Sequence, residues 1–370
     1  MQLENYLDEL RPLVNVDCGT QTVEGVAVIA DIMAKKYKDM GWHAEIVDLG
    51  KEVGPGVFAT NKPNASQYDV LLVGHMDTVF PPGTAAERPM STDATRLYGP
   101  GAADMKSGLM NILWALRALD DKDVERLSIA VTMNPDEETG SVYSHEWIGK
   151  YAKQSRCVLV AEAARADGSL VKARKGMVRY NIDFHGRAAH AGNAPEKGRS
   201  AITELANWVL AINQLGDKER GTTLNVGVIK GGDAANIVPD KAQAVVDVRF
   251  WDNNEYDRIN KAMHEMTNRA YVEDVTATVT QMAHTPAMSP SEETEKLMAL
   301  VEKCGNEENI AINWLAVGGG SDANHTAALG VPSLDGFGPI GADFHSPAEY
   351  VELDSIIPRI KLLSRIVKSL

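Results

Sequence analysis

The stretch 69–77 reads Asp-Val-Leu-Leu-Val-Gly-His-Met-Asp and contains a short apolar run. Its unbroken apolar run is typical of a strand that is buried on both faces of a sheet. Further apolar runs lie at 128–133 and 157–161, and helical patterns at 23–40 and 109–119 alternate with the strands. Because strands that alternate with helices build layered sheets, we predict a mixed-sheet α/β sandwich with helices on both faces.

The middle of the chain has a different pattern, in which the elements follow in the order β-α-β-β-α-β. The six segments lie at 177–185, 199–215, 223–229, 242–251, 254–270 and 275–281. This order is that of the ferredoxin-like split βαβ unit. The first pattern resumes after this region. We therefore predict an inserted ferredoxin-like βαββαβ domain at 176–286 and a discontinuous larger domain at 1–175 and 287–370.

Length and composition exclude several classes of protein. At ~150 residues per domain, the 370 residues suggest two or three domains. Asp and Glu number 51 against 37 Lys and Arg, and the net charge of −14 disfavours nucleic-acid and anionic-membrane partners. The chain has no apolar run of ~18 residues and begins with an acidic segment, so we expect neither a membrane span nor a signal peptide.

The three cysteines are Cys18, Cys157 and Cys304. They are far apart in the sequence and show no metal-ligand spacing, which argues against a disulfide framework and against a thiolate zinc site. Together with the missing signal peptide, this leads us to expect a cytoplasmic protein.

Residue types that bind metal ions follow the predicted strands. His75 ends the first buried strand, and ligands in open α/β sheets bind beyond such carboxyl ends. Asp77 can accept the second N–H of the imidazole and thereby orient it. Glu137 and Glu138 follow the next buried strand, where adjacent carboxylates repel each other unless a cation lies among them. Glu162 repeats this arrangement after a third strand.

Two further candidates lie in loops. Asp104 is part of the glycine-rich stretch 99–108, just before a predicted helix, and His345 lies near the C-terminus. Each candidate also has an ordinary interpretation: a structural histidine, a helix N-cap aspartate or a solvated acidic turn. The glycine-rich stretch matches neither phosphate-binding fingerprint, which disfavours a nucleotide-binding protein.

Taken together, these residues supply two histidines and three carboxylates, a ligand set for two divalent ions such as zinc. Asp104, Glu138 and Glu162 with a bridging hydroxide carry four negative charges, which two divalent ions neutralise. A single ion would leave two negative charges uncompensated, and buried uncompensated charge is costly.

These segments resemble the M20 family of zinc metallopeptidases, most closely its glutamate carboxypeptidase branch. The matching stretches span nearly the whole chain in one order and lie at 74–79, 99–108, 136–141, 190–192, 236–239, 247–249, 318–323 and 345–346. The family also has the inserted β-α-β-β-α-β domain, as a lid and dimerisation domain. The resemblance implies a homodimer formed through this domain.

The resemblance implies two bound zinc ions, replaceable by cobalt or manganese, with Asp104 as the bridging ligand. The remaining ligands would be His75 and Glu162 at one ion, and Glu138 and His345 at the other. Each ion would then have a mixed set of nitrogen and oxygen donors, as zinc prefers.

The resemblance also implies catalytic and substrate-binding residues. Glu137 would be the general base for a metal-bridging hydroxide that attacks an amide carbonyl, and Asp77 would orient His75. His190 would reach into the partner subunit's site and stabilise the oxyanion. The expected substrate contacts are Asn236, Arg249, Gly318, Gly319 and Gly320.

The function implied is a zinc metallocarboxypeptidase, a dizinc amide hydrolase that releases a C-terminal amino acid from small peptides or N-acyl amino acids. Glutamate is one candidate, but the glutamate-specific branch carries Arg-Pro-Ala where this chain has Thr285-Pro286-Ala287. The basic residues Arg174 and Lys175 can compensate in part. An N-acyl-amino-acid deacylase or a dipeptidase on the same scaffold stays open. A non-catalytic peptide-binding or metal-binding relative is disfavoured, because the base and every ligand position are present.

Overall fold

The computed structural model describes residues 1–370, which divide into two compact units. The larger unit consists of Met1–Ala173, Pro290–Val317 and Ser321–Leu370. The smaller unit consists of Arg174–Ser289 and Gly318–Gly320. The role of the smaller unit as a lid and dimerisation domain stays a prediction.

The sequence-based division assigned the three glycines at 318–320 to the larger domain. In the structure they group with the smaller unit. Arg174 holds them there, because its Nη1 donates hydrogen bonds to the carbonyl oxygens of Gly319 (2.9 Å) and Gly320 (3.0 Å).

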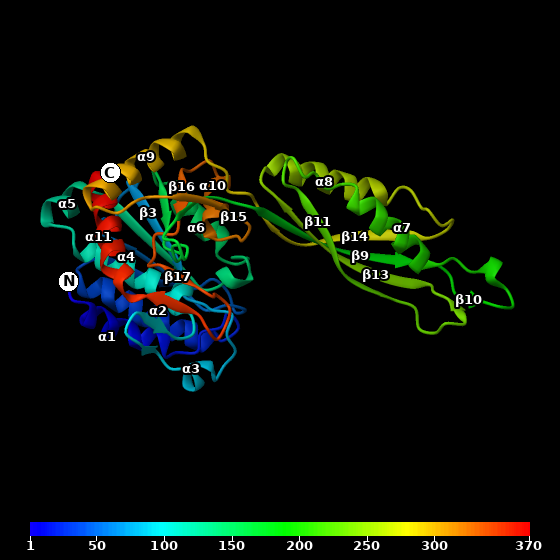
Figure 1. Ribbon diagram of the computed structural model, residues 1–370, viewed down its shortest axis with the longest axis horizontal. Helices are drawn as coiled ribbons and strands as arrows, with labels where there is room; N and C mark the ends of the chain where they lie inside the picture. The colour runs from blue at the N-terminus through cyan, green and yellow to red at the C-terminus, as the bar shows by residue number, and fades with distance from the viewer. The chain divides into compact units, whose positions relative to one another are not determined.

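An eight-stranded mixed sheet forms the centre of the larger unit, with the order β1-β2-β6-β3-β7-β16-β8-β15 (Figure 1). The strands are β1 (His43–Val47), β2 (Gly56–Thr60), β3 (Val70–His75), β6 (Ile129–Asn134), β7 (Val158–Val160), β8 (Leu170–Arg174), β15 (Trp314–Val317) and β16 (Ser333–Asp335). β3 runs parallel to both of its neighbours, β6 and β7. β1 and β2 add antiparallel pairs at one edge. The predicted mixed α/β fold is thereby confirmed, although the sequence analysis predicted no strand at β8.

Helices cover both faces of this sheet. One face shares a core with α1 (Leu3–Val14), α2 (Val23–Asp39), α4 (Ser107–Arg117), α9 (Glu292–Glu307) and α11 (Leu353–Ser369). The other face packs against α6 (His145–Ala152) and α10 (Asp322–Ala328), and Phe58 of β2 stacks on Tyr151 of α6 with 4.1 Å between the ring centroids. The unit is completed by the short helices α3 (Thr84–Glu87) and α5 (Asp121–Arg126) and by a small sheet of β4 (Ser91–Thr92), β5 (Arg96–Tyr98), β18 (Tyr350–Glu352) and β17 (Gly341–Ala342).

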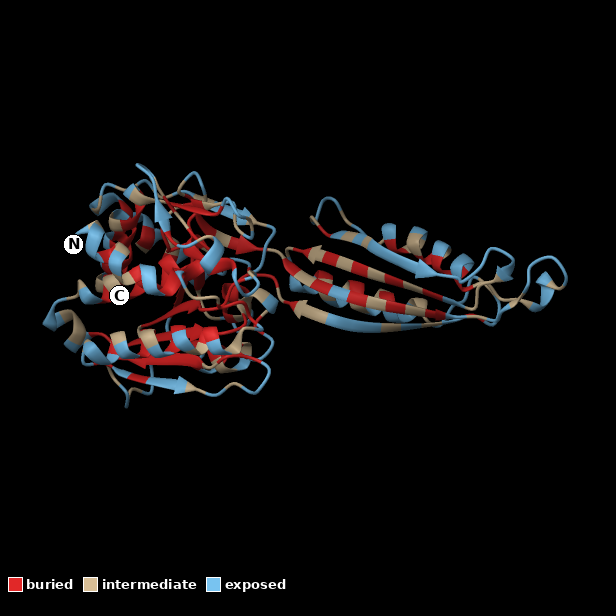
Figure 2. Ribbon diagram, turned by 90° about the horizontal axis from the view of Figure 1, so that it is seen from below, coloured by how far each residue is buried: buried red, intermediate tan, exposed pale blue.

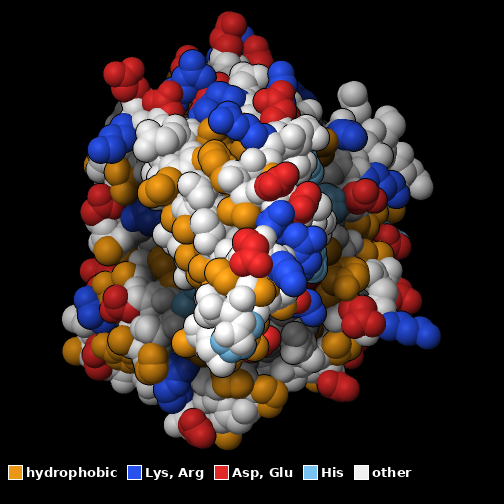
Figure 3. Space-filling model, turned by 90° about the vertical axis from the view of Figure 1, so that its right-hand side faces the viewer, with side chains coloured by type: hydrophobic (Ala, Val, Ile, Leu, Met, Phe, Trp, Pro, Cys, Tyr) orange, Lys and Arg blue, Asp and Glu red, His pale blue; other side chains and the backbone are white.

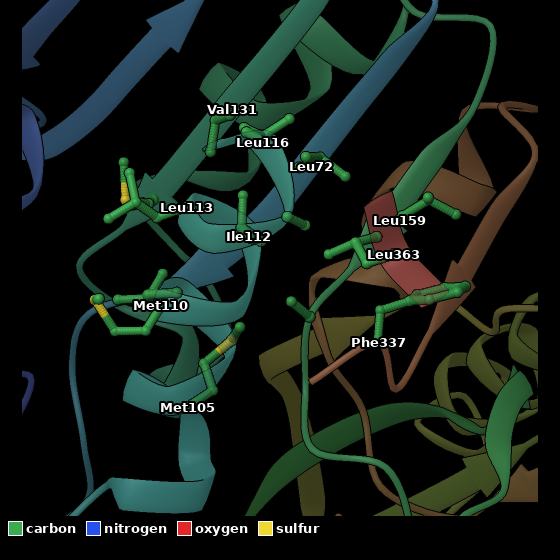
Figure 4. Close-up of a cluster of buried hydrophobic side chains, with 14 of the residues drawn as sticks. Leu72, Met105, Met110, Ile112, Leu113, Leu116, Val131, Leu159, Phe337 and Leu363 are labelled. Atoms are coloured by element: carbon green, nitrogen blue, oxygen red, sulfur yellow. The ribbon is translucent and has the colours of Figure 1, made fainter. Parts of the chain in front are cut away.

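Helix α4 is deeply buried near the strand ends, and Figure 4 shows its side chains among those of β3, β6, β7 and α11. Leu109, Ile112, Leu113 and Leu116 are each exposed by 2% or less. Burying such a side chain contributes ~1.5–3 kcal/mol. The core therefore fixes the position of α4 and of the loop 99–106 that leads into it.

Gly108 allows the first turn of α4 to touch the chain that follows β7. A Cβ atom at this position would lie 1.9 Å from the backbone oxygen of Ala161. Only glycine permits this approach, since real carbon and oxygen atoms do not come so close. The contact brings the loop before α4 next to the residues after β7.

The smaller unit is a four-stranded antiparallel sheet with the order β11-β13-β9-β14. Its elements follow the order β9 (Gly176–His185), α7 (Ala201–Asn213), β11 (Thr223–Gly231), β13 (Lys241–Phe250), α8 (Asn253–Met266) and β14 (Thr276–Thr285), with a small ladder of β10 (Ala189–His190) and β12 (Ile237–Val238). Buried and partly exposed residues alternate along β9 and β13, as Figure 2 shows. The buried set packs against Trp208 of α7 and Ile259 of α8, so both helices cover one face and the other face stays open.

The surface carries both signs of charge. Figure 3 shows Lys and Arg side chains interspersed with Asp and Glu on the face in view, with hydrophobic side chains between them. None of the helices combines the length and the apolar character that a bilayer span requires.

The close approach at Gly108 predicts a loss of stability when a methyl group is added. In Gly108→Ala, the Cβ would clash with the backbone after β7, so α4 or β7 must shift. We expect the free energy of unfolding of the metal-free protein in urea to fall by ~1–3 kcal/mol. The control is Gly318→Ala, whose Cβ would meet no atom within 4 Å. Equal unfolding midpoints for the two variants would contradict this interpretation.

Candidate metal centre

The five residues predicted as metal ligands come together at one edge of the large sheet. β6, β3 and β7 lie side by side and run in the same direction, so their carboxyl ends meet there. The ligand atoms form two groups, each within 4.8 Å: His75, Asp104 and Glu162, and Asp104, Glu138 and His345. Asp104 belongs to both groups.

The two carboxylate oxygens of Asp104 face different histidines. Oδ1 lies 3.1 Å from Nε2 of His75, and Oδ2 lies 3.2 Å from Nε2 of His345. Nε2 of His75 also lies 3.4 Å from Glu162, and Nε2 of His345 lies 3.1 Å from Glu138. The arrangement is that of one shared carboxylate between two separate ligand groups.

Each ligand comes from a different element. His75 is the last residue of β3, and Glu162 lies two residues after β7. Glu138 lies in the one-turn helix Glu137–Thr139 after β6. Asp104 lies in the irregular helical segment Ala102–Lys106 that leads into α4, and its own backbone angles are not helical. His345 lies in the loop between β17 and β18, with a positive φ of 60°.

Asp77 contacts both the ring of His75 and the turn that carries Glu137 and Glu138. The backbone oxygen of Asp77 lies 3.0 Å from Nδ1 of His75, and its carboxylate oxygen lies 3.3 Å from the same atom. The carboxylate of Asp77 also accepts the backbone N–H groups of Glu137 (3.1 Å) and Glu138 (3.2 Å) and the hydroxyl of Thr20 (2.6 Å). The sequence did not predict these contacts with the Glu137–Glu138 turn.

The acidic groups perturb one another strongly. Burial raises the pKa of Glu137, of Glu138 and of Glu162, the last to about 7. Against the raising effect of burial, hydrogen bonds from His345 and His75 hold the pKa of Asp104 below its usual range. Asp104 and Glu138 raise the pKa of His345 to about 10. Positive charge among these carboxylates is therefore favoured.

A divalent ion would supply this positive charge with suitable donors. Imidazole nitrogens and carboxylate oxygens are the ligands of zinc and similar metals. Oε1 of Glu138 is buried and has no hydrogen-bond partner, so an acceptor is available inside the cluster. Both observations fit a metal centre at this position.

A second layer of polar groups lies behind the Glu137–Glu138 turn. Asp136 accepts the Ser144 hydroxyl and the Tyr143 N–H, and the fully buried Asp322 accepts the Ser141 hydroxyl at 2.6 Å. Burial raises the pKa of Asp322 to about 7. Asp322 lies in the stretch 318–323 that resembles the family, but the sequence pattern predicted no role for it.

Glu349 was also missed by the sequence analysis. It is 1% exposed, and its carboxylate accepts the backbone N–H groups of Gly101 (3.1 Å), Ala103 (2.8 Å) and Asp104 (3.0 Å). Burial raises the pKa of Glu349 to about 7, while these N–H groups favour the carboxylate. The glycine-rich loop was the only signal in the sequence, since consecutive N–H groups in such loops bind anions.

The remaining predicted residues lie in the smaller unit. His190 is exposed on β10, and its Nδ1 accepts the backbone N–H groups of Gly192 and Asn193, each at 3.1 Å. Asn236 lies beside it, since its backbone oxygen accepts the N–H of Ala191 at 2.9 Å. The structure therefore brings His190 and Asn236 together within this unit.

Arg249 and the loop 318–320 each bind groups of the chain itself, and their contacts with substrate stay predictions. The guanidinium of Arg249 lies on the open face of the sheet and binds the carboxylate of Asp247 through two hydrogen bonds, at 2.8 and 3.2 Å. Asp247 is two residues away on the same strand and therefore points to the same face. In the loop 318–320, the carbonyl groups of Gly319 and Gly320 are used by Arg174.

Comparison with known proteins gives a consistent result. The family described as Peptidase family M20/M25/M40 matches residues 71–369. Carboxypeptidase G2 from Pseudomonas sp. (strain RS-16) is 32% identical over 369 residues, which cover 98% of this chain and 88% of that protein.

Solved structures agree with this assignment. Aminopeptidase PepT from Bacillus cereus has a TM-score of 0.82 and 25% identity, covering 100% of this chain and 98% of that chain. An M20 family metallo-carboxypeptidase from Sulfolobus solfataricus has the same fold, with a TM-score of 0.77 and 18% identity over 100% of this chain and 99% of that chain. The resemblance inferred from the sequence motifs is confirmed: the chain belongs to peptidase family M20/M25/M40 and is a hydrolytic enzyme.

Proposed function

We propose that the enzyme is a two-metal amide hydrolase that releases a C-terminal amino acid from small peptides or N-acyl amino acids. The observation that carries this proposal is the shared carboxylate of Asp104, whose two oxygens face His75 and His345. A carboxylate divided in this way is suited to bridge two ions. The ligand groups then hold one ion with His75 and Glu162 and the other with Glu138 and His345.

Zinc suits these groups best, because it takes nitrogen and oxygen donors together, and cobalt or manganese can take its place. Two such ions, when bound, would polarise the amide carbonyl and lower the pKa of a water molecule. Asp77 would fix the ring of His75 so that Nε2 faces the centre, since the backbone oxygen of Asp77 lies 3.0 Å from Nδ1.

Glu137 is the proposed general base. Its carboxylate is free of the contacts that join the five ligands, while its backbone N–H is held by Asp77 at 3.1 Å. Burial raises its pKa, which makes it a better proton acceptor than an ordinary glutamate. Glu137 would take a proton from the attacking water and pass it to the leaving nitrogen as the C–N bond breaks.

His190 is the proposed donor to the oxyanion. Because Nδ1 accepts two backbone N–H groups, the proton of the neutral ring lies on Nε2. Nε2–H is therefore available to donate a hydrogen bond from an exposed position on β10. In a homodimer this donor would serve the partner subunit's site.

The homodimer is proposed to form through the smaller unit. β11 is an edge strand of its sheet, and Val228 and Ile229 on it are 45% and 52% exposed. On α7, Ile202 and Leu210 are 41% and 67% exposed. An unpaired edge strand with exposed apolar residues is a surface that a second copy of the chain can cover.

Substrate choice is the open part of the proposal. The name of carboxypeptidase G2 favours release of a C-terminal residue. Asp247 binds Nε and Nη2 of the Arg249 guanidinium, so a terminal carboxylate would bind through the other N–H groups of that side chain or replace Asp247. A deacylase or dipeptidase activity on the same centre is the alternative, and it differs only in which groups flank the amide bond.

Metal content gives the first test. We expect two zinc ions per chain in the wild-type enzyme. Glu138→Ala and Glu162→Ala should each retain one ion, whereas Asp104→Ala should bind neither firmly, because Asp104 belongs to both ligand groups. The ions are counted by mass spectrometry of the metals after gel filtration. An Asp104→Ala variant that retains two ions would contradict the shared-ligand arrangement.

Glu137→Gln gives the second test. The variant should keep both zinc ions but lose at least ~100-fold in turnover, the usual contribution of a general base. Zinc-loaded enzyme is incubated with a panel of N-acyl amino acids, dipeptides and tripeptides, and products are identified by mass spectrometry. Glu146→Gln, an exposed glutamate on α6, serves as the matched control. Near-wild-type turnover in the Glu137 variant would show that another group is the base.

His190→Ala should reduce kcat by ~10²–10³-fold, the usual cost of losing an oxyanion donor. Metal content and oligomeric state should stay unchanged, since His190 belongs to neither ligand group. The matched control is His185→Ala, an exposed histidine at the end of β9. Steady-state kinetics with light scattering provide the measurement, and unchanged kcat would remove His190 from the mechanism.

A further inference from the structure

Glu349 is a buried carboxylate whose partners are backbone N–H groups. One oxygen, Oε1, accepts the N–H of Ala103 and of Asp104, and the other, Oε2, accepts the N–H of Gly101. All three donors belong to the loop that presents Asp104 to the metal centre. Burying a carboxylate is costly unless its oxygens are satisfied, and here both oxygens are.

The loop 99–106 therefore acts as an anion-binding nest for a group of the protein itself. Consecutive backbone N–H groups that converge in a loop bind phosphates or other anions in many proteins. In this chain the anion is the Glu349 carboxylate. The carbonyl oxygen of Pro100, in the same loop, is held by the ammonium of Lys106 at 3.1 Å, and Lys106 is itself 1% exposed.

These contacts fix the backbone of Asp104 while its side chain serves both ligand groups. The N–H of Asp104 is bound by Glu349 at 3.0 Å, and its two carboxylate oxygens lie 3.1 Å from His75 and 3.2 Å from His345. Any rotation of the Asp104 backbone moves both oxygens together. The geometry of both ligand groups consequently depends on the hydrogen bonds that Glu349 accepts.

Glu349 also belongs to the segment that carries His345. Its own N–H donates to the carbonyl oxygen of Ser346 at 3.3 Å, and the hydroxyl of Ser346 donates to the carbonyl of Asp343 at 2.7 Å. The turn from 343 to 349 is thus closed by its own hydrogen bonds. One residue links the loop of Asp104 to the turn of His345.

We propose that Glu349 is a positioning residue for the metal centre: by binding the N–H groups of Gly101, Ala103 and Asp104, it sets Asp104 and His345 in the geometry that two metal ions require. This inference rests on the proposed two-metal function. Glu349 itself touches neither substrate nor ligand atoms, and its effect passes through Asp104 and the turn of His345.

The test compares zinc affinity in Glu349→Gln with that of the wild type. Glutamine offers one acceptor oxygen, and its NH₂ group would face at least one of the three N–H donors. We expect the weaker of the two zinc affinities to fall by ~10–100-fold, as for other residues that orient metal ligands. Affinities are measured by competition with a chromophoric chelator, at a temperature where circular dichroism shows the metal-free variant to be folded.

A purely structural role would give a different result. It would lower the melting temperature of the metal-free protein and leave the zinc affinity of the folded protein unchanged, and this outcome would overturn the proposal. If Glu349→Gln does not fold, Glu349→Asp carries the same test, because it keeps the charge but withdraws the carboxylate by one methylene. Reduced affinity is expected for this variant as well.

Glu352→Gln is the matched control. Glu352 lies three residues further on, is partly exposed, and pairs with Arg96 at 2.9 Å instead of with the N–H groups of the loop 99–106. The zinc affinity of the Glu352→Gln variant should equal that of the wild type. A wild-type enzyme that fails to bind two ions would refute the proposed function, whereas two ions bound with equal affinity by wild type and Glu349→Gln would refute only the role of Glu349.

Discussion

The carboxylate of Asp104 faces His75 with one oxygen and His345 with the other, and much of the larger unit serves to hold it there. Asp104 lies just before α4, whose apolar side chains are buried against the large sheet and α11. Gly108 lets the first turn of α4 touch Ala161, next to Glu162. The packing of α4 thus sets the distance between Asp104 and Glu162, two carboxylates that would otherwise repel each other.

Two buried carboxylates outside the ligand set perform the same physical task on two different turns. Asp77 binds the N–H groups of Glu137 and Glu138, and Glu349 binds those of Gly101, Ala103 and Asp104. Hydrogen bonds to charged acceptors are roughly twice as strong as those between neutral groups. The turn that carries Glu138 and the loop that carries Asp104 are in this way each held by a buried carboxylate.

The sequence predicted those parts of the site that depend on local patterns. Buried strands have continuous apolar runs, and parallel neighbours end at one edge, so the sequence alone is enough to place His75, Glu138 and Glu162 near one another. Contacts between a side chain and a distant backbone leave no such pattern. Glu349 lies 245 residues from Asp104, and the partners of Arg249 and of the loop 318–320 depend on which face or unit each residue occupies. β8 was missed because Lys172 interrupts its short apolar pattern.

The chemistry of the nest explains why a carboxylate, and no neutral side chain, occupies position 349. Three N–H groups converge on it, and each needs an acceptor. An amide of the same length would direct its own N–H groups at one of these donors, and an aliphatic side chain would leave all three unsatisfied, at a cost of about 1–3 kcal/mol each. Only a group with two acceptor oxygens and no donor satisfies the loop. The negative charge so placed also adds to the field of the neighbouring carboxylates, which increases the attraction of the centre for divalent cations.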